Sequence, residues 1–486
     1  MIRSTPALQT LLVLLAASAA FPVTAQQTLD RTKVPAPGPQ PVLRVPTWTR
    51  SPLASGAELI VSQKDDLPLV SFTITFLGGA GQFDAADRRG VGSLTAAMLS
   101  EGTTTKTGEE LSNALQLLGT NVSTRVGGET ASIGFISTSA RFGPTLGILA
   151  DMLLHSTFPA DALERLRGQR LVALAQAKAQ PGGIADRVFP RVLYGPAHPY
   201  GQPVTESSIK AITRADVVAF HQQLFKPGRA LVTVAGAVKP AEAKAAIDHA
   251  LAAWGRGGEK PAFSYPPVPP QQPTTIYLVD RPGAEQATFA IGAPGPPRNT
   301  PDYYALEVMN TILGGQFQSR LNANIREEKG YSYGVRSGFS FGKGPGPFRT
   351  GGDIVGDKAD AALVEFMKEL RGIQGARPIS DDELATAKSA IVQGLPSMFA
   401  SVSGINAALS ELWVDGLPDD YYQQYGKAID AVTKDDVVRV ATKYIPIDRL
   451  AVVIVGDRAA LQKPLDATKI APIVLLDTDG MGVVGR

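Results

Sequence analysis

The chain carries an internal repeat, which constrains its fold more strongly than any other feature of the sequence. Residues 212–236 read ITRADVVAFHQQLFKPGRALVTVAG, and residues 432–456 read VTKDDVVRVATKYIPIDRLAVVIVG, at an offset of 220 residues without a gap. In each copy a threonine, Thr213 or Thr433, stands where it would cap a helix, and a turn then leads into an apolar strand. Copies this far apart predict two duplicated domains rather than a solenoid of short repeats.

The two halves also begin alike, although this match is looser. In the first half, residues 69–77 alternate as a strand does and precede a helical segment at 91–99. In the second half, a short strand at 288–291 ends in Gly292 and precedes a helix at 302–313. Strands mixed with helices predict an α+β fold with two homologous domains, each a mostly antiparallel sheet covered by helices. Further helices are expected at 108–118, 161–179, 357–372 and 381–394.

Proline-rich segments set the expected domain boundaries. The 486 residues are too many for one ordinary core, and residues 257–273 contain two Pro-Pro pairs, which is typical of an extended linker. Residues 26–45 are rich in Pro and Gln and are interpreted as a flexible lead-in. The predicted domains are therefore residues 46–256 and 274–460, followed by a tail at 461–486 that has little pattern.

Residues 1–25 are typical of a secretory signal peptide. Arg3 supplies a basic start, residues 11–21 are apolar, and Val23-Thr24-Ala25 offers small residues for cleavage. The apolar run is about half of the ~20 residues that a membrane span needs, so we expect cleavage, export to the periplasm or beyond, and no membrane span in the mature chain. The chain has no cysteine, which excludes disulfides, a lipid-modified cysteine and thiolate metal sites.

Charge and motifs argue against several classes of protein. The formal net charge is +2 and no long basic run occurs, so no nucleic-acid partner is expected. Neither a G-x-S-x-G elbow nor a P-loop is present. The four histidines are interpreted as structural residues, because no two of them lie at i,i+4, and they offer no arrangement for a self-sufficient hydrolase: His155, His198, His221 and His249.

One segment of the first half resembles a zinc-peptidase element. Residues 89–103 read RGVGSLTAAMLSEGT. This is similar to the element G-[LV]-A-H-F-L-E-H-M-L-F-x-G-T of the pitrilysin/insulinase (inverzincin) family, in which two histidines at i,i+4 bind zinc and a glutamate is the general base. The resemblance places Ser93 and Ala97 at the two histidines and Ala96 at the glutamate. The residues that fit the frame are Gly90, Val91, Met98, Leu99, Gly102 and Thr103.

The resemblance implies that this chain has lost the whole zinc site. The third ligand of the family is a glutamate on a later helix, and the matching helix at 161–179 has acidic residues only at Asp161 and Glu164. Its middle, residues 171–175, is wholly apolar. The alternative is that the 91–99 helix is simply a core helix, in which the small residues allow close packing. In either case no intrinsic catalytic residue and no zinc are expected on this chain.

A segment of the second half resembles the second-domain motif of the same family, L-G-x-x-x-S-R-L…R-E-x-x-G-[LY]-x-Y. Residues 313–335 read LGGQFQSRLNANIREEKGYSYGV. In the family the Arg and Tyr of this motif bind the substrate backbone and stabilise the oxyanion, so the resemblance gives these roles to Arg326 and Tyr333. The alternative is that Tyr333 is buried packing and that Arg326 pairs with Glu327 or Glu328.

The resemblance covers about residues 45–460 and implies a function. Some bacterial members of the family work as paired subunits that each form half of a clam-shell, and this chain resembles the subunit without the zinc motif. We therefore expect a non-catalytic subunit of a heteromeric periplasmic zinc metallopeptidase, inactive alone. A homologous H-x-x-E-H partner would carry the zinc, and the two chains would enclose a peptide substrate. The alternative is a peptide-binding or assembly scaffold without a catalytic role.

Overall fold

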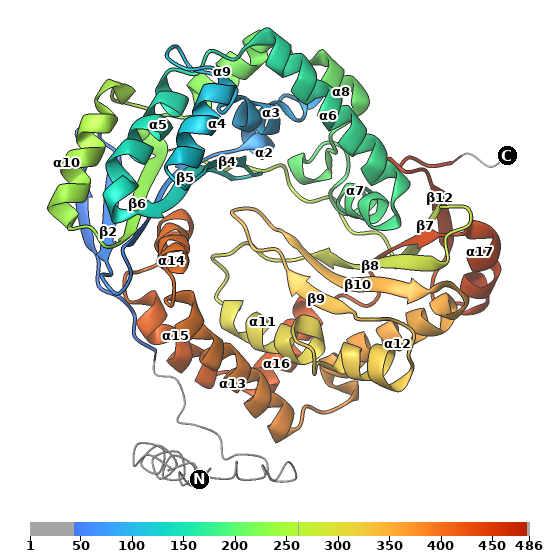
Figure 1. Cartoon of the computed structure of the whole chain (residues 1–486). Helices are drawn as coiled ribbons and strands as arrows, with labels where there is room; N and C mark the ends of the chain where they lie inside the picture. The colour runs from blue at the N-terminus through green and yellow to red at the C-terminus, as the bar shows by residue number, and fades with distance from the viewer. Residues whose placement is uncertain (1–42, 261, 484–486) are drawn as a thin grey trace, which may run out of the picture. The chain divides into compact units, whose positions relative to one another are not determined.

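The computed structural model describes residues 43–260 and 262–483 (Figure 1). The predicted signal peptide, 1–25, lies outside the described residues, as does most of the predicted lead-in, 26–45. Within the described ranges, no helix combines the length and the hydropathy that a membrane crossing requires.

The first half forms a six-stranded sheet. The strands lie in the order β1-β2-β6-β3-β5-β4, and every neighbouring pair except β2 and β6 is antiparallel. The strand β3 has the predicted bounds, because its residues alternate between an apolar face and a hydroxyl-bearing face. The strands are β1 Thr49–Pro52, β2 Glu58–Gln63, β3 Leu69–Leu77, β4 Val122–Val126, β5 Thr130–Thr138 and β6 Ala230–Gly236.

The second half forms another six-stranded sheet, in the order β12-β7-β11-β8-β10-β9. Five strands repeat the order of the first sheet, with β7-β11-β8-β10-β9 in the places of β2-β6-β3-β5-β4, and the pair β7–β11 is parallel as β2–β6 is. The edge strands differ, because β12 is parallel to β7 whereas β1 is antiparallel to β2. The predicted α+β fold with two similar, mostly antiparallel sheets is therefore confirmed. The strands are β7 Thr275–Asp280, β8 Gln286–Pro294, β9 Arg336–Phe339, β10 Pro347–Val355, β11 Ala451–Gly456 and β12 Ile473–Leu476.

Helices cover both sheets. Those of the first half are α2 Ala80–Phe83, α3 Val91–Met98, α4 Gly108–Leu117, α5 Phe142–Leu154, α6 Ala160–Ala179, α7 Pro181–Tyr194, α8 Glu206–Ala211, α9 Arg214–Leu224 and α10 Pro240–Ala250. Those of the second half are α11 Tyr303–Asn310, α12 Ala359–Arg371, α13 Asp381–Met398, α14 Val402–Asp415, α15 Tyr421–Asp430, α16 Lys434–Tyr444 and α17 Arg458–Ala467.

The repeated helix begins with the same cap in both halves. Thr213 accepts a hydrogen bond from the backbone N–H of Asp216 at the start of α9, and Thr433 accepts one from Asp436 at the start of α16. In both cases the aspartate side chain accepts the threonine N–H in return, which completes a capping box. The predicted threonine caps are confirmed.

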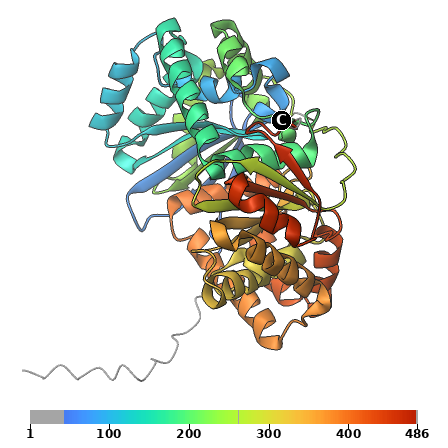
Figure 2. The same cartoon turned by 90° about the vertical axis from the view of Figure 1, so that its right-hand side faces the viewer.

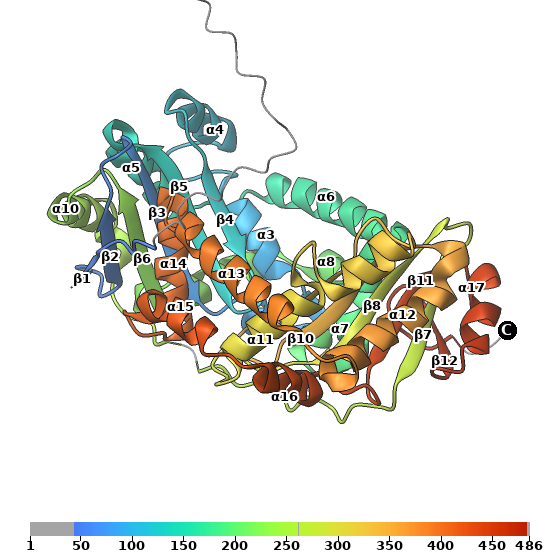
Figure 3. The same ribbon diagram turned by 90° about the horizontal axis from the view of Figure 1, so that it is seen from below.

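Two equivalent helices cross between the halves (Figures 1 and 3). The first-half helix α7 contacts β8 and β11 of the second sheet, and the second-half helix α14 contacts β3 and β6 of the first. The α7 contact is apolar, since Val188 and Phe189 pack with Val453 and Val455. The α14 contact is polar: the Asn406 amide donates to Ser71 Oγ, 3.0 Å away. The two sheets are therefore held together by an exchange of helices.

The opposite face of the second sheet carries helices of its own half, seen in yellow and orange in Figure 2. Phe366 of α12 stacks on Phe289 of β8, with ring centroids 5.8 Å apart. The strand β11 is apolar throughout, because Val452 and Ile454 face these helices while Val453 and Val455 face α7.

The structure differs from the sequence expectations at two places in the second half. The strand expected at 288–291 extends over Gln286–Pro294, because Gly292 does not end it. A Cβ at Gly292 would lie 1.9 Å from the carbonyl oxygen of Phe348, so the glycine permits close strand pairing instead. Residues 461–486 were expected to be a patternless tail, yet they contain most of α17 and the edge strand β12.

Candidate functional site

The helix α3 carries the residues that the resemblance places at the positions of the zinc ligands. It begins after Gly90, whose φ of +103° is the left-handed conformation that glycine favours. The carboxylate of Asp84 accepts hydrogen bonds from the backbone N–H groups of Gly90 (2.7 Å) and Gly92 (3.0 Å). Burial raises the pKa of Asp84, although these two hydrogen bonds act in the opposite direction. Leu94 and Met98 are buried in the core, so α3 does form the core stripe of the alternative interpretation.

The side chains of Ser93, Ala96 and Ala97 do not fit a zinc ion. Ser93 and Ala97 are partly buried and Ala96 is buried. The Ser93 hydroxyl donates to the carbonyl oxygen of Gly90 at 3.0 Å. Zinc sites in proteins are built from imidazole, thiolate and carboxylate groups, and these three residues offer none of them.

The helix α6 runs beside α3, and its Arg170 donates to the carbonyl oxygen of Ser93 at 3.4 Å. Glu164 pairs with Arg167 at 3.0 Å. The apolar middle of α6 is not part of the core, since Val172 is 59% exposed. Over residues 43–260 and 262–483, no group of three or more His, Cys, Asp or Glu side chains is placed to hold a metal ion.

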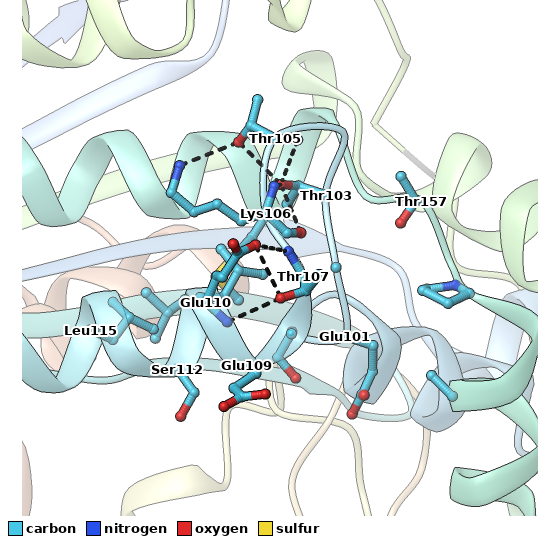
Figure 4. A pocket seen from close by; sticks show the side chains of 18 of the residues that line it. Glu101, Thr103, Thr105, Lys106, Thr107, Glu109, Glu110, Ser112, Leu115 and Thr157 are labelled. Carbon is cyan, nitrogen blue, oxygen red and sulfur yellow. Dashed lines mark hydrogen bonds between the residues drawn. The ribbon is translucent and has the colours of Figure 1, made fainter.

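A cavity of about 1170 Å³ lies next to α3, lined by the 100–107 segment and α4 (Figure 4). Several of its polar side chains are engaged in local hydrogen bonds. Thr107 and Glu110 form the capping box of α4, and Thr103 and Thr105 each donate to Asp151 at 2.6 Å. None of the three residues that replace the zinc ligands and the base lines this cavity. Its hydrogen bonds therefore serve the local fold.

One part of the second-half motif is buried and structural. Arg320 is 3% exposed and donates to both carboxylate oxygens of Glu383, at 2.7 and 2.8 Å. It also donates to the carbonyl oxygens of Arg377 (3.1 Å) and Pro378 (3.2 Å). The Arg320 hydrogen bond lowers the pKa of Glu383 to about 2, against the effect of burial. Arg320 thus ties the motif to the start of α13.

The other part of the motif faces solvent. Arg326 is 31% exposed, and its Nε lies 3.4 Å from Glu327 Oε1, as the alternative interpretation anticipated. Tyr333 is 90% exposed, so it is not the buried packing residue of that alternative. Tyr333 lines a surface cavity of about 750 Å³ together with residues 179–181 and 281–286.

The helix α6 connects the two candidate regions. Its Arg170 contacts Ser93, and its last residue, Ala179, lines the cavity of Tyr333. At 1.5 Å per residue, these two positions on α6 are about 14 Å apart along the helix axis. Ser93 and Tyr333 therefore belong to two separate regions of the molecule.

A residue that the sequence analysis did not single out lies against Arg326. The Arg326 guanidinium lies over the ring of Phe317, 4.2 Å from its centroid, and Phe317 is 62% exposed. The signal in the sequence was a phenylalanine within the polar, glycine-rich segment GGQFQS.

Three of the four histidines make local contacts. The His198 side chain accepts the backbone N–H of Tyr200 in a turn, and His221 contacts the carbonyl oxygen of Leu153 at 2.9 Å. His155 contacts Asp151 at 3.1 Å.

Comparison with known proteins gives a consistent result. Residues 211–391, which include Arg326 and Tyr333, match the family model described as peptidase M16 inactive domain. An uncharacterized zinc protease of Mycobacterium leprae is 27% identical over 299 residues, which cover 59% of this chain and 65% of that protein. The match thus spans slightly less than two thirds of that relative. An uncharacterized zinc protease of Bacillus subtilis is 23% identical over 362 residues, covering 73% of this chain and 85% of that protein.

Solved structures share the fold. The crystal structure described as a peptidase M16 inactive domain from Pseudomonas fluorescens is 27% identical, with a TM-score of 0.78, and covers 85% of this chain and 99% of its own. A chain of complex III2 from Candida albicans, solved with Inz-5 bound, is 14% identical with a TM-score of 0.68, and covers 86% and 99%. The second similarity concerns the fold alone, and it shows the fold within a multisubunit complex.

Proposed function

This chain belongs to the M16 peptidase family, of the inactive-domain type, and on that premise we propose that it is the non-catalytic subunit of a two-chain zinc metallopeptidase. The partner would be a homologous chain with an H-x-x-E-H motif. This chain would form half of the wall around a peptide substrate and would present Arg326 and Tyr333 to the partner's zinc site.

The exposure of Arg326 and Tyr333 carries this proposal. Tyr333 faces solvent and Arg326 is partly exposed, in a motif whose neighbouring Arg320 is almost completely buried. They lie in a different region from α3, where Ser93, Ala96 and Ala97 leave no zinc ligand and no general base. In the described part of the chain no cluster of metal-binding side chains lies near these two hydrogen-bond donors, so they are suited to a centre supplied by another chain.

The chemistry of the two residues fits this role. A guanidinium and a phenol both donate hydrogen bonds, and donors aimed at a developing oxyanion stabilise the transition state of peptide hydrolysis. Zinc on the partner would polarise the scissile carbonyl and activate a water molecule. Arg326 and Tyr333 would hold the peptide backbone and the oxyanion from the opposite wall.

Export to the periplasm is part of the proposal. It rests on the signal-like residues 1–25 and on the lack of cysteine, which leaves the chain insensitive to an oxidising compartment.

The test begins with a search of the neighbouring reading frames for an exported H-x-x-E-H chain, which is then purified separately from this chain and together with it. Zinc is measured by elemental analysis, and cleavage is measured with a quenched-fluorescence peptide. We expect that only the partner binds zinc and that only the complex of the two chains cleaves the peptide. Arg326→Ala and Tyr333→Phe should each lower kcat by roughly 10²-fold or more while the zinc content is unchanged.

Arg449→Ala is the matched control, because Arg449 is a 62% exposed arginine on another surface, and its kcat should equal that of the unmodified complex. Stoichiometric zinc on the lone chain would overturn the proposal. If the complex is stable and its kcat is unchanged by Arg326→Ala and by Tyr333→Phe, the chain is instead a scaffold.

A further inference from the structure

Two aromatic side chains are largely exposed to solvent in the described part of the chain. They are Phe317, 62% exposed, and Tyr333, 90% exposed. Aromatic side chains contribute most to stability when they are buried, so exposure of two of them in one motif points to a role other than packing. Tyr333 already has a proposed role, whereas Phe317 has none.

Phe317 supports Arg326 rather than the core. The guanidinium carbon of Arg326 lies 4.2 Å from the centroid of the Phe317 ring. A cation–π contact of this kind does not occupy the N–H groups as an ion pair does, so N–H groups of Arg326 stay available to a ligand. The ion pair between Arg326 and Glu327 is weak, because Arg326 Nε and Glu327 Oε1 are 3.4 Å apart and the Glu327 side chain is 58% exposed.

The segment that carries Phe317 is held by a buried amide. The Asn322 side chain, 5% exposed, donates to the carbonyl oxygen of Gln316 and to Ser319 Oγ, both at 3.2 Å. Its oxygen accepts the backbone N–H of Val335 at 3.1 Å. The Asn322 amide therefore binds both Gln316, which precedes Phe317, and Val335, which lies two residues after Tyr333. It thereby links the segment of Phe317 to the segment of Tyr333.

We propose that Phe317 is a positioning residue, whose ring holds the Arg326 guanidinium in the orientation in which it meets the peptide substrate. This inference rests on the proposed function, since it concerns how Arg326 acts at the partner's site. Phe317 itself forms no bond to the reacting atoms. It narrows the range of Arg326 conformers before the substrate binds, which lowers the entropic cost of binding the transition state.

The test compares Phe317→Leu, which removes the ring, with Phe317→Tyr, which keeps it. In the complex with the H-x-x-E-H chain, Phe317→Leu should lower kcat about two- to fivefold, the size of an exposed cation–π contact, with KM nearly unchanged. Phe317→Tyr should restore most of the lost kcat. Arg326→Ala is measured beside them, and in the Arg326→Ala background Phe317→Leu should have no further effect.

A second readout uses this chain alone, with arginine labelled by ¹⁵N for NMR and the Arg326 signal assigned by its loss in Arg326→Lys. The ring-current shift of the Arg326 Nε–H signal should persist in Phe317→Tyr and disappear in Phe317→Leu. A Phe317→Leu variant with unchanged kcat or an unchanged Arg326 signal would overturn the positioning role. If Arg326→Ala itself leaves kcat unchanged, the proposed role of Arg326 fails, and the inference fails with it.

Discussion

Replacing Arg320 with alanine should lower the melting temperature strongly, whereas the same replacement at Arg326 should lower it much less. Both arginines belong to one motif, but Arg320 is 3% exposed and Arg326 is 31% exposed. Arg320 makes two hydrogen bonds to Glu383 and one each to two backbone carbonyl oxygens. Its loss leaves the Glu383 carboxylate and both carbonyl groups without these partners.

The magnitude follows from that geometry. Removing one partner of a buried ion pair costs about 3–5 kcal/mol. The lower end applies here, because the Glu383 side chain is 31% exposed and water can reach it. At about 2–4 °C per kcal/mol for a domain of this size, Arg320→Ala should lower Tm by about 6–12 °C. Arg326 has one long contact to an exposed carboxylate, worth about 0–1 kcal/mol. It also has a cation–π contact with the exposed Phe317 ring, worth about 0.5–1 kcal/mol, so Arg326→Ala should lower Tm by less than Arg320→Ala.

Thermal melts at pH 7, followed by circular dichroism at one scan rate, measure the difference. Arg320→Lys is an informative control, since lysine keeps the charge but cannot form the paired bonds to Glu383, so its Tm should remain well below that of the unmodified chain. Equal Tm values for Arg320→Ala and Arg326→Ala would refute the division of the motif into a structural and a solvent-facing part.

Three further predictions concern stability. The pKa of Glu383 is lowered from 4.5 to about 2 in the folded chain, so its ion pair stabilises the fold above pH 4.5 and is lost as the pH falls towards 2. In that pH range, Tm should therefore fall less steeply for Glu383→Gln than for the unmodified chain. Glu129 accepts hydrogen bonds from two tyrosine hydroxyls and from the backbone N–H groups of Lys343 and Gly344. Glu129→Gln should therefore lower the free energy of unfolding by about 1–3 kcal/mol and speed tryptic cleavage after Lys343, and an unchanged cleavage rate would contradict this. Thr213→Ala and Thr433→Ala should each cost about 1 kcal/mol in thermal melts, and a cost at only one of them would argue against equivalent caps.

Much of the fold was predictable because it depends on local patterns. Residues 69–77 alternate, and the structure has a strand there; Thr213 and Thr433 precede apolar-periodic segments, and both cap helices. The pattern was misleading at Gly292, since a glycine that ends a strand and one that allows close strand pairing look the same in a sequence. It gave no signal for β12, an edge strand of four residues.

The candidate site was predictable only as a set of positions. The resemblance singled out Ser93, Ala96 and Ala97, and their lack of metal-binding groups follows from residue type alone. The contrast between Arg320 and Arg326 does not follow from residue type, because it depends on whether Glu383, distant in the sequence, lies within reach. The sequence did not single out Phe317 for the same reason, because only the folded structure shows that its ring lies against Arg326.

The sequence by itself determined the duplication, the alternation of strands and helices, and the lack of metal-binding groups at Ser93, Ala96 and Ala97, because each depends on residue type and spacing. The tertiary structure decided which helices cover which sheet, since the exchange of α7 and α14 is set by surfaces that meet only on folding. It also decided that Tyr333 and Phe317 face solvent and that Arg326 is partly exposed while Arg320 is buried, because burial depends on neighbours that the chain brings together from afar.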